Sequence, residues 1–185
     1  MSVSQKDCVS QKDRERITQY YHQRALNYLA RYNTSSHKLS LYLQRKATQQ
    51  WGDSIPEFIP LMVQSIIVRL QKLQLLDDMA FGRGRMRHYQ QKNFASSLIK
   101  TKLSLDGLDK DTIEQLLYEA KAQGELDEME MARQYAKSKQ LGRFHPDFNQ
   151  EEASLETQYK QQQKSLRKMA ARGFGYELAK RALYD

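Results

Sequence analysis

The sequence has a single cysteine, three prolines and no apolar stretch approaching the ~20 residues that a helix needs to cross a bilayer. Because Cys8 is alone, no disulfide forms within the chain, which is typical of a reducing compartment. Cys8 lies in a polar stretch, and we interpret it as an incidental exposed thiol. The first residues also lack the apolar segment of a signal peptide. We therefore expect a cytoplasmic protein without a membrane anchor.

Motifs for catalysis and metal binding are also missing. The four histidines are scattered, with no HExxH and no Cys/His ligand spacing. Residues 81–86, FGRGRM, contain two glycines but lack both a preceding strand and a Lys-Ser/Thr pair, so they are not a phosphate-binding loop. There is no GxSxG motif and no convincing nucleophile–base pair. These absences favour a binding protein over an enzyme and predict neither a cofactor nor a metal site.

The periodicity that is present is helical almost throughout. Apolar residues make up 39% of the chain and charged residues 28%, which favours thin helical layers over one large core. Apolar stripes with a period of three to four residues recur from Ile17 onward, with the strongest on residues 59–73. Residues 1–13 are polar and have no such period, so we expect them to be disordered.

A helix–Gly–apolar–helix pattern occurs twice, 66 positions apart, around Gly107 and Gly173. Glycine reaches the left-handed conformation at low cost and commonly ends a helix, and the apolar residue after it, Leu108 or Phe174, packs back. Ala47 holds the corresponding position earlier in the chain. We therefore predict an all-α fold of three tandem three-helix repeats, at residues 14–76, 77–125 and 126–185, forming an elongated, curved array.

Helix starts carry equally local signals. Asp77 is a predicted N-cap, flanked by Leu76 and Phe81 as a hydrophobic staple. The same device returns at Asp127, with Leu126 and Met131 as the staple and Glu130 completing a capping box. A third capping box is predicted from Ser54 and Glu57, before a helix whose regular part is delayed by Pro60.

The net charge is +8 and the sequence pI is about 9.5, which favours an anionic partner. The charge is segregated, because residues 80–105 and 131–146 contain no acidic residue whereas residues 106–130 contain nine. Such alternation is equally compatible with ordinary solvated helix faces that pair between neighbouring units. Tyr89 and Tyr135 are the two tyrosines close enough to basic clusters to be tested as stacking platforms.

Four segments together resemble the RecX family of bacterial recombination regulators. They are residues 25–46 (ALNYLARYNTSSHKLSLYLQRK), 66–81 (IIVRLQKLQLLDDMAF), 100–117 and 167–183. Residues 91–103, QKNFASSLIKTKL, lack the Gly-Tyr-Gly-Pro-like joint that family members usually carry. The resemblance implies three tandem three-helix repeats, and we expect the protein to act as a monomer. It also implies binding in the helical groove of the RecA filament, across neighbouring protomers, which restrains ATP hydrolysis, strand exchange and coprotease activity in DNA repair and the SOS response.

Under this interpretation nine cations are candidate contacts to an acidic RecA surface or to DNA phosphates. They are Arg83, Arg85, Arg87, Lys92, Lys100, Lys102, Arg133, Lys137 and Lys139. Weak binding to single- or double-stranded DNA fits the same basic surface. The alternative is a helix-turn-helix-type DNA-binding module without a RecA target. Against it, no single helix combines Arg, Asn and Gln in an obvious recognition turn.

Overall fold

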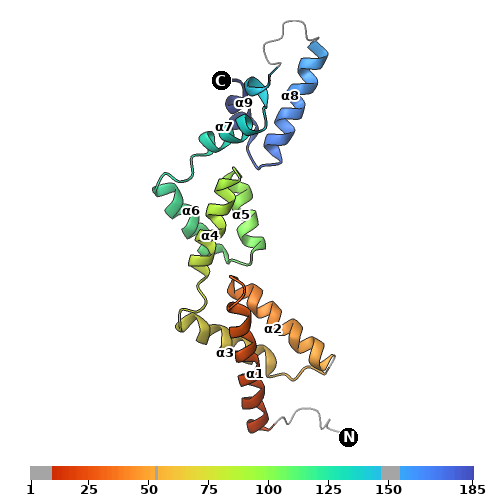
Figure 1. Cartoon of the computed structure of the whole chain (residues 1–185), viewed down its shortest axis with the longest axis vertical. Coiled ribbons are helices and arrows are strands. Elements are labelled where there is room, and N and C mark those ends of the chain that lie inside the picture. Colours follow the sequence, from red (N-terminus) through yellow and green to blue (C-terminus); the bar gives the residue numbers. More distant parts are fainter. Residues whose placement is uncertain (1–9, 53, 147–154) are drawn as a thin grey trace. The chain divides into compact units, whose positions relative to one another are not determined.

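The computed structural model describes residues 10–52, 54–146 and 155–185, and in these residues the fold is all-α with no strand. Cys8 and most of the 1–13 segment lie outside the described residues. The helices shown in Figure 1 are α1 Gln11–Leu29, α2 Ser36–Trp51, α3 Ile59–Lys72, α4 Asp78–Gln91, α5 Ser96–Leu105, α6 Lys110–Ala122, α7 Glu128–Ser138, the 3₁₀ turn η1 Gly142–Phe144, α8 Leu155–Ala170 and α9 Tyr176–Tyr184.

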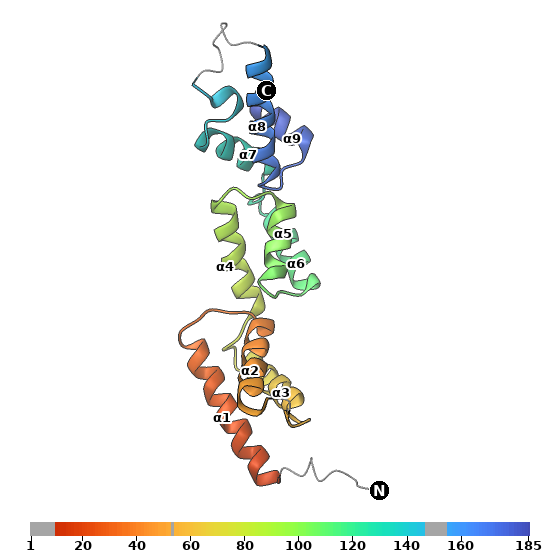
Figure 2. The same ribbon diagram turned by 90° about the vertical axis from the view of Figure 1, so that its right-hand side faces the viewer.

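The chain divides into two compact units, residues 1–81 with 106–108, and residues 82–105 with 109–185. The principal helix contacts join α1, α2 and α3 to one another, α5 to α6, and α9 to both α7 and α8. Figure 2 shows α5 beside α6. These groups lie within the expected repeats, whose boundaries stay a prediction.

The first unit has a core formed by all three of its long helices. Tyr21 on α1, Leu43 on α2 and Leu70 on α3 are completely buried there. Trp51 closes one end, where its ring stacks on that of Tyr21 at 5.9 Å. The apolar stripes of the sequence therefore face inward, and the polar faces lie in solvent.

Gly107 ends α5 in a left-handed conformation, with φ of +86°, as the sequence predicts. It also lies against the N-terminus of α2. The Ser35 hydroxyl donates to the backbone oxygen of Asp106 at 2.8 Å, and a Cβ at Gly107 would lie 2.7 Å from that hydroxyl oxygen. Lys38 Nζ reaches the Asp106 carboxylate at 2.8 Å. Glycine is therefore needed here for both its backbone angle and its lack of a side chain.

We call such a contact, between a helix-ending glycine and the start of another helix, a joint. The second unit contains a similar joint made by other residues. Gly173 has φ of +87°, and its backbone oxygen accepts a 2.8 Å hydrogen bond from the Ser97 hydroxyl at the start of α5. A Cβ at Gly173 would lie 2.7 Å from the Cβ of Leu98. The backbone N–H of Ala95 also donates to the oxygen of Arg172 at 2.9 Å. Leu108 and Phe174, the residues after the two glycines, are both buried as expected.

Local capping signals are largely confirmed. The Asp77 carboxylate accepts from the backbone N–H of Ala80 at 2.9 Å, and Asp127 accepts from that of Glu130 at 3.0 Å. The carboxylate of Glu130 accepts a hydrogen bond from the Gln134 side chain at 3.0 Å instead of completing the expected capping box. These caps satisfy N–H groups that have no partner within their own helices.

The predicted capping box at Ser54 and Glu57 is wrong. No side chain caps α3, which begins at Ile59 with Pro60 in its first turn. A helix starting after Ser54 would place Pro60 in its interior, where the ring removes a hydrogen bond and clashes with the preceding turn. The proline therefore sets the start of this helix.

Two helix ends bear on the remaining boundaries. Trp51 and Gly52 close α2, as the sequence indicates, and Gly52 has φ of +57°, so Ala47 does not stop this helix although it holds the position of the two glycines. The Cβ of alanine makes the left-handed conformation costly, so the helix runs on to the next glycine. At the N-terminus α1 already begins at Gln11, capped by the Ser10 hydroxyl, so residues 11–13 are helical and not disordered.

Candidate interaction surface

The nine cations predicted from the sequence all belong to the second unit. Arg83, Arg85 and Arg87 lie on α4 with Lys92 just after it, Lys100 and Lys102 lie on α5, and Arg133, Lys137 and Lys139 lie on or just after α7. The structure divides them into two groups. Arg85 and Lys102 are partly buried against aromatic rings, and the other seven are exposed.

Tyr89 on α4 is the first ring of this aromatic cluster. The Arg85 guanidinium donates to the Tyr89 hydroxyl and lies 4.9 Å from the ring centroid. Lys102 Nζ, from α5, lies 5.7 Å from the same centroid and 4.8 Å from that of Phe94. A cation over an aromatic face is stabilised by about 0.5–1 kcal/mol at exposed sites and by more when desolvated. Lys102 therefore links α5 to Tyr89 of α4, whereas the contact between Arg85 and Tyr89 lies within α4.

Arg172, which follows α8 by two residues, extends this cluster to Tyr135 on α7. Its guanidinium carbon lies 4.5 Å from the Phe94 centroid and 4.8 Å from that of Tyr135 on α7. One of its nitrogens also donates to the backbone oxygen of Lys92 at 3.4 Å. We call Arg85, Tyr89, Phe94, Lys102, Tyr135 and Arg172 the cation–aromatic cluster.

The cluster changes the interpretation of the two flagged tyrosines. Tyr89 is only 7% exposed and Tyr135 only 8% exposed. A nucleobase needs an open ring face on which to stack. These tyrosines are therefore part of the packing and are not stacking platforms.

The exposed cations are arranged in pairs one helical turn apart. Arg83 and Arg87 share a face of α4, and Arg133 and Lys137 share a face of α7. Across the described residues these four side chains make no ion pair. They are thus available to an anionic partner without losing an internal contact.

Lys100 is placed differently from these pairs. Its Nζ lies 3.5 Å from the Glu114 carboxylate on α6, which Lys110 also approaches at 3.9 Å. Both Lys100 and Glu114 are about half exposed, so the pair is worth little in water.

Two sets of residues were missed from the sequence. Phe94 and Arg172 could not be recognised as members of the cluster, because their contact depends on how the segment after α4 packs against the segment after α8. A row on α8, Lys160, Lys164 and Lys168, was also left out, although its spacing of four residues is visible in the sequence. Regular spacing of like charges on one helix face was the signal available for that row.

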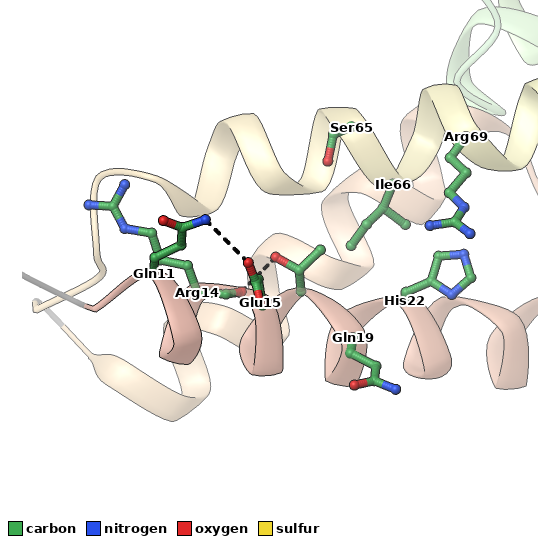
Figure 3. Close-up of a pocket in the computed structure, with 9 residues that line it drawn as sticks. Gln11, Arg14, Glu15, Gln19, His22, Ser65, Ile66 and Arg69 are labelled. Atoms are coloured by element: carbon green, nitrogen blue, oxygen red, sulfur yellow. Dashed lines mark hydrogen bonds between the residues drawn. The ribbon is translucent and has the colours of Figure 1, made fainter.

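A hollow of about 690 Å³ lies between α1 and α3 in the first unit. Figure 3 shows Arg14 and His22 of α1 on one side and Arg69 of α3 on the other. Its carboxylate, Glu15, accepts a long 3.4 Å hydrogen bond from Gln11. The two hydroxyls that line it donate to backbone oxygens of their own helices, Thr18 to Arg14 at 2.7 Å and Ser65 to Met62 at 2.8 Å.

Neither a metal site nor a membrane-spanning helix is found in the part of the chain that the structure describes. No group of three or more His, Cys, Asp or Glu side chains there is close enough to hold a metal ion. No described helix is both long and apolar enough to span a membrane. Asp109, the N-cap of α6, is a carboxyl group whose pKa is shifted by its role as a cap. Hydrogen bonds from Thr112 lower the pKa of Asp109 at the start of α6.

No protein-family model matches this sequence, and no curated protein matches it. The fold, however, is similar to that of two crystal structures. RecX from Lactobacillus salivarius has a TM-score of 0.65 and 19% identity, over 91% of this chain and 95% of that one. A structure described as regulatory protein RecX has a TM-score of 0.62 and 20% identity, over 92% of this chain and 76% of that one. The RecX-like all-α fold expected from the sequence is therefore confirmed.

Proposed function

We propose that this chain, which has the fold of RecX, is a non-enzymatic regulator that binds the RecA recombinase filament and inhibits its activities. The observation that supports this most strongly is the extent of the fold similarity, which covers 91% of this chain and 95% of the RecX from L. salivarius. The motif resemblance in residues 25–46 and 66–81 points to the same family. The proposed setting is the cytoplasm, in DNA repair and the SOS response.

The exposed cation pairs are the proposed contacts with RecA. Two separate helices each carry one such pair, Arg83 with Arg87 on α4 and Arg133 with Lys137 on α7. Separate helices can engage neighbouring protomers of a filament, and linkage then raises the effective concentration of the second contact. Modest affinity for one protomer is thus sufficient for firm binding to the polymer. The proposed active form is a monomer.

Arg85 and Lys102 have a different role in this proposal. Their charges lie on the rings of Tyr89 and Phe94, so they support the helices that carry the exposed cations. We assign them to positioning and not to direct contact.

The test is the ATPase activity of RecA on single-stranded DNA with increasing amounts of this protein. We expect hydrolysis to fall as the ratio of protein to RecA rises. An inactive control is the protein after heat denaturation. Unchanged hydrolysis at every ratio would reject the proposal, and co-sedimentation with RecA filaments, compared with naked DNA, separates binding to RecA from binding to DNA.

A further inference from the structure

The exposed side of α8 carries a dense row of positive charge beside an exposed aromatic ring. A shallow hollow of about 630 Å³ lies along it, and its lining includes Tyr159, Lys160, Lys164, Arg167 and Lys168. We call these five residues the α8 basic face. Tyr159 is 61% exposed, so its ring is open to solvent, in contrast to the buried Tyr89 and Tyr135.

A second hollow, of about 350 Å³, adjoins the other side of the same lysine row. Lys160, Lys164 and Lys168 line it together with Lys139, which follows α7. Positive charge from two separate elements therefore converges here. Clefts lined by charge of one sign focus the potential and attract oppositely charged ligands.

Among the described residues, acidic side chains neutralise little of this row. Lys160 is paired with Glu156 at 2.6 Å, but both side chains are about three-quarters exposed, so the pair is weak. Lys164, Arg167 and Lys168 make no ion pair with any described residue. Successive lysines are four residues apart, which is a rise of about 6 Å along the helix.

We propose that the α8 basic face binds the phosphate backbone of a single-stranded nucleic acid, with Tyr159 as a platform on which one base stacks. A linear row of cations matches a linear row of phosphates. An open aromatic ring beside that row adds stacking, which requires a base that is not paired in a duplex. This site lies outside the proposed RecA contacts on α4 and α7, and it goes beyond the proposed function.

Two other partners fit the face less well. A duplex offers phosphates to the lysine row, but its bases are paired and leave none free to stack on the exposed ring of Tyr159. An acidic polypeptide would engage the lysines but would gain no stacking on Tyr159. The lysine row together with the exposed ring of Tyr159 therefore favours a single-stranded nucleic acid as the partner.

The test uses the full chain without RecA and a fluorescently labelled oligothymidine of about 20 nucleotides, with binding followed by anisotropy. Lys160, Lys164 and Lys168 are changed together to Gln. The matched control changes Lys72, Lys110 and Lys121 to Gln, which removes the same charge from other exposed positions. We expect the α8 variant to bind at least about tenfold more weakly, with a slope of log affinity against log salt smaller by about 2, as the loss of three single-strand phosphate contacts implies.

The contribution of the ring is measured separately. Tyr159→Ala is expected to lose about fivefold or more in affinity for the single strand, and Tyr159→Phe to keep it. A duplex of the same length should bind more weakly and respond little to Tyr159→Ala. Deoxyribose and ribose oligonucleotides are compared to show which strand is preferred.

Several outcomes would overturn the proposal. They are equal losses in the α8 variant and the charge-matched control, equal binding of duplex and single strand with no effect of Tyr159→Ala, and competition by polyglutamate as strong as that by unlabelled oligonucleotide. Because all the changed side chains are exposed, the circular dichroism spectrum and the urea midpoint should match those of the unchanged protein. RecA is absent from these measurements, so their outcome is independent of the ATPase test.

Discussion

The hydroxyl of Ser35, at the N-terminus of α2, lies 2.8 Å from the backbone oxygen of Asp106, 71 positions further along the chain. The same hydroxyl accepts from the backbone N–H of Lys38 at 3.3 Å. One side chain therefore caps α2 and also binds the backbone of Asp106, which belongs to the same compact unit. A similar contact, from the Ser97 hydroxyl to the backbone oxygen of Gly173, is made at 2.8 Å in the second unit.

The glycines in these joints should not tolerate alanine. Gly107→Ala and Gly173→Ala each add a methyl group within 2.7 Å of a neighbouring atom, at a backbone angle that L-residues rarely adopt. We expect each to lower the free energy of unfolding by about 2 kcal/mol or more, combining conformational strain with overpacking. Urea denaturation measures this change.

Gly84 supplies the control for those two substitutions. It lies inside α4, and a Cβ there would meet nothing within 4 Å. Gly84→Ala should therefore stabilise the protein by about 0.5–1 kcal/mol, because alanine favours the helix. A similar loss at all three glycines would show that the joints have no special role.

Removing the Ser35 hydroxyl should cost more than an ordinary N-cap. Ser35→Ala loses both the cap and the bond to Asp106, and Ser35 is completely buried. We expect a loss of about 2 kcal/mol in unfolding free energy, against about 1 kcal/mol for a typical cap. Ser10→Ala, at the exposed N-cap of α1, provides the comparison in the same urea experiment. Equal effects of the two substitutions would contradict the double role.

Arg172 should be coupled to Phe94. Its guanidinium carbon lies 4.5 Å from the Phe94 centroid, although the two residues are distant in sequence. In a double-mutant cycle of Arg172→Gln and Phe94→Leu, we expect a coupling energy of about 0.5–2 kcal/mol. Arg181 with Phe94 is a control pair that shares no contact in the structure. Additive effects of Arg172→Gln and Phe94→Leu would exclude the interaction.

The cap at Asp109 should give the protein a pH-dependent increment of stability. Hydrogen bonds from Thr112 lower the pKa of this carboxyl below its usual 3.8, so the folded state favours the charged form. The increment is present above the unfolded pKa and is lost as the pH falls through the folded pKa. Asp109→Ala should cost about 1 kcal/mol at pH 7 and progressively less below pH ~4.

Asp109→Asn separates capping from charge. Asparagine caps as well as aspartate but does not titrate, so this variant should stay close to the unchanged protein at pH 7. Urea midpoints between pH 7 and pH 2 measure both variants. A cost of Asp109→Ala that does not change with pH would contradict the assignment.

Charge reversal on the exposed cation pairs should weaken inhibition of RecA. Arg83→Glu with Arg87→Glu, or Arg133→Glu with Lys137→Glu, places repulsive charge where an acidic partner would bind. We expect at least about a tenfold rise in the protein concentration that halves RecA ATPase activity. Lys72→Glu with Lys121→Glu is the control. If this concentration rose equally in all three variants, the effect would come from net charge and not from the exposed cation pairs.

The features predicted correctly from the sequence are those whose physics is local. Asp77 and Asp127 cap their helices because an aspartate before an apolar run needs no tertiary contact to do so. Gly107 and Gly173 end their helices for the same kind of reason. Their close approach to Ser35 and Leu98 was not predictable, because it depends on the docking of helices far apart in the sequence.

The same distinction separates the predicted site from the observed one. Charge could be counted from the sequence, so the exposed Arg83 and Lys137 were identified. The burial of Tyr89 and Tyr135 could not be, because it depends on Arg172 and Lys102 arriving from other helices. The capping box predicted at Ser54 was wrong, because proline is tolerated only in the first turn of a helix and Pro60 therefore places the start of α3 at Ile59.

The joint at Gly107 also determines where this molecule can be divided for separate study. Residues 106–108 belong to the first compact unit although α4 and α5 precede them in the chain. A fragment ending at residue 81 would thus expose the buried Ser35 and leave Lys38 without its carboxylate. Domain dissection must therefore follow the packing instead of the chain order, because a boundary after residue 81 keeps the apolar core of the first unit but removes the contacts made by residues 106–108.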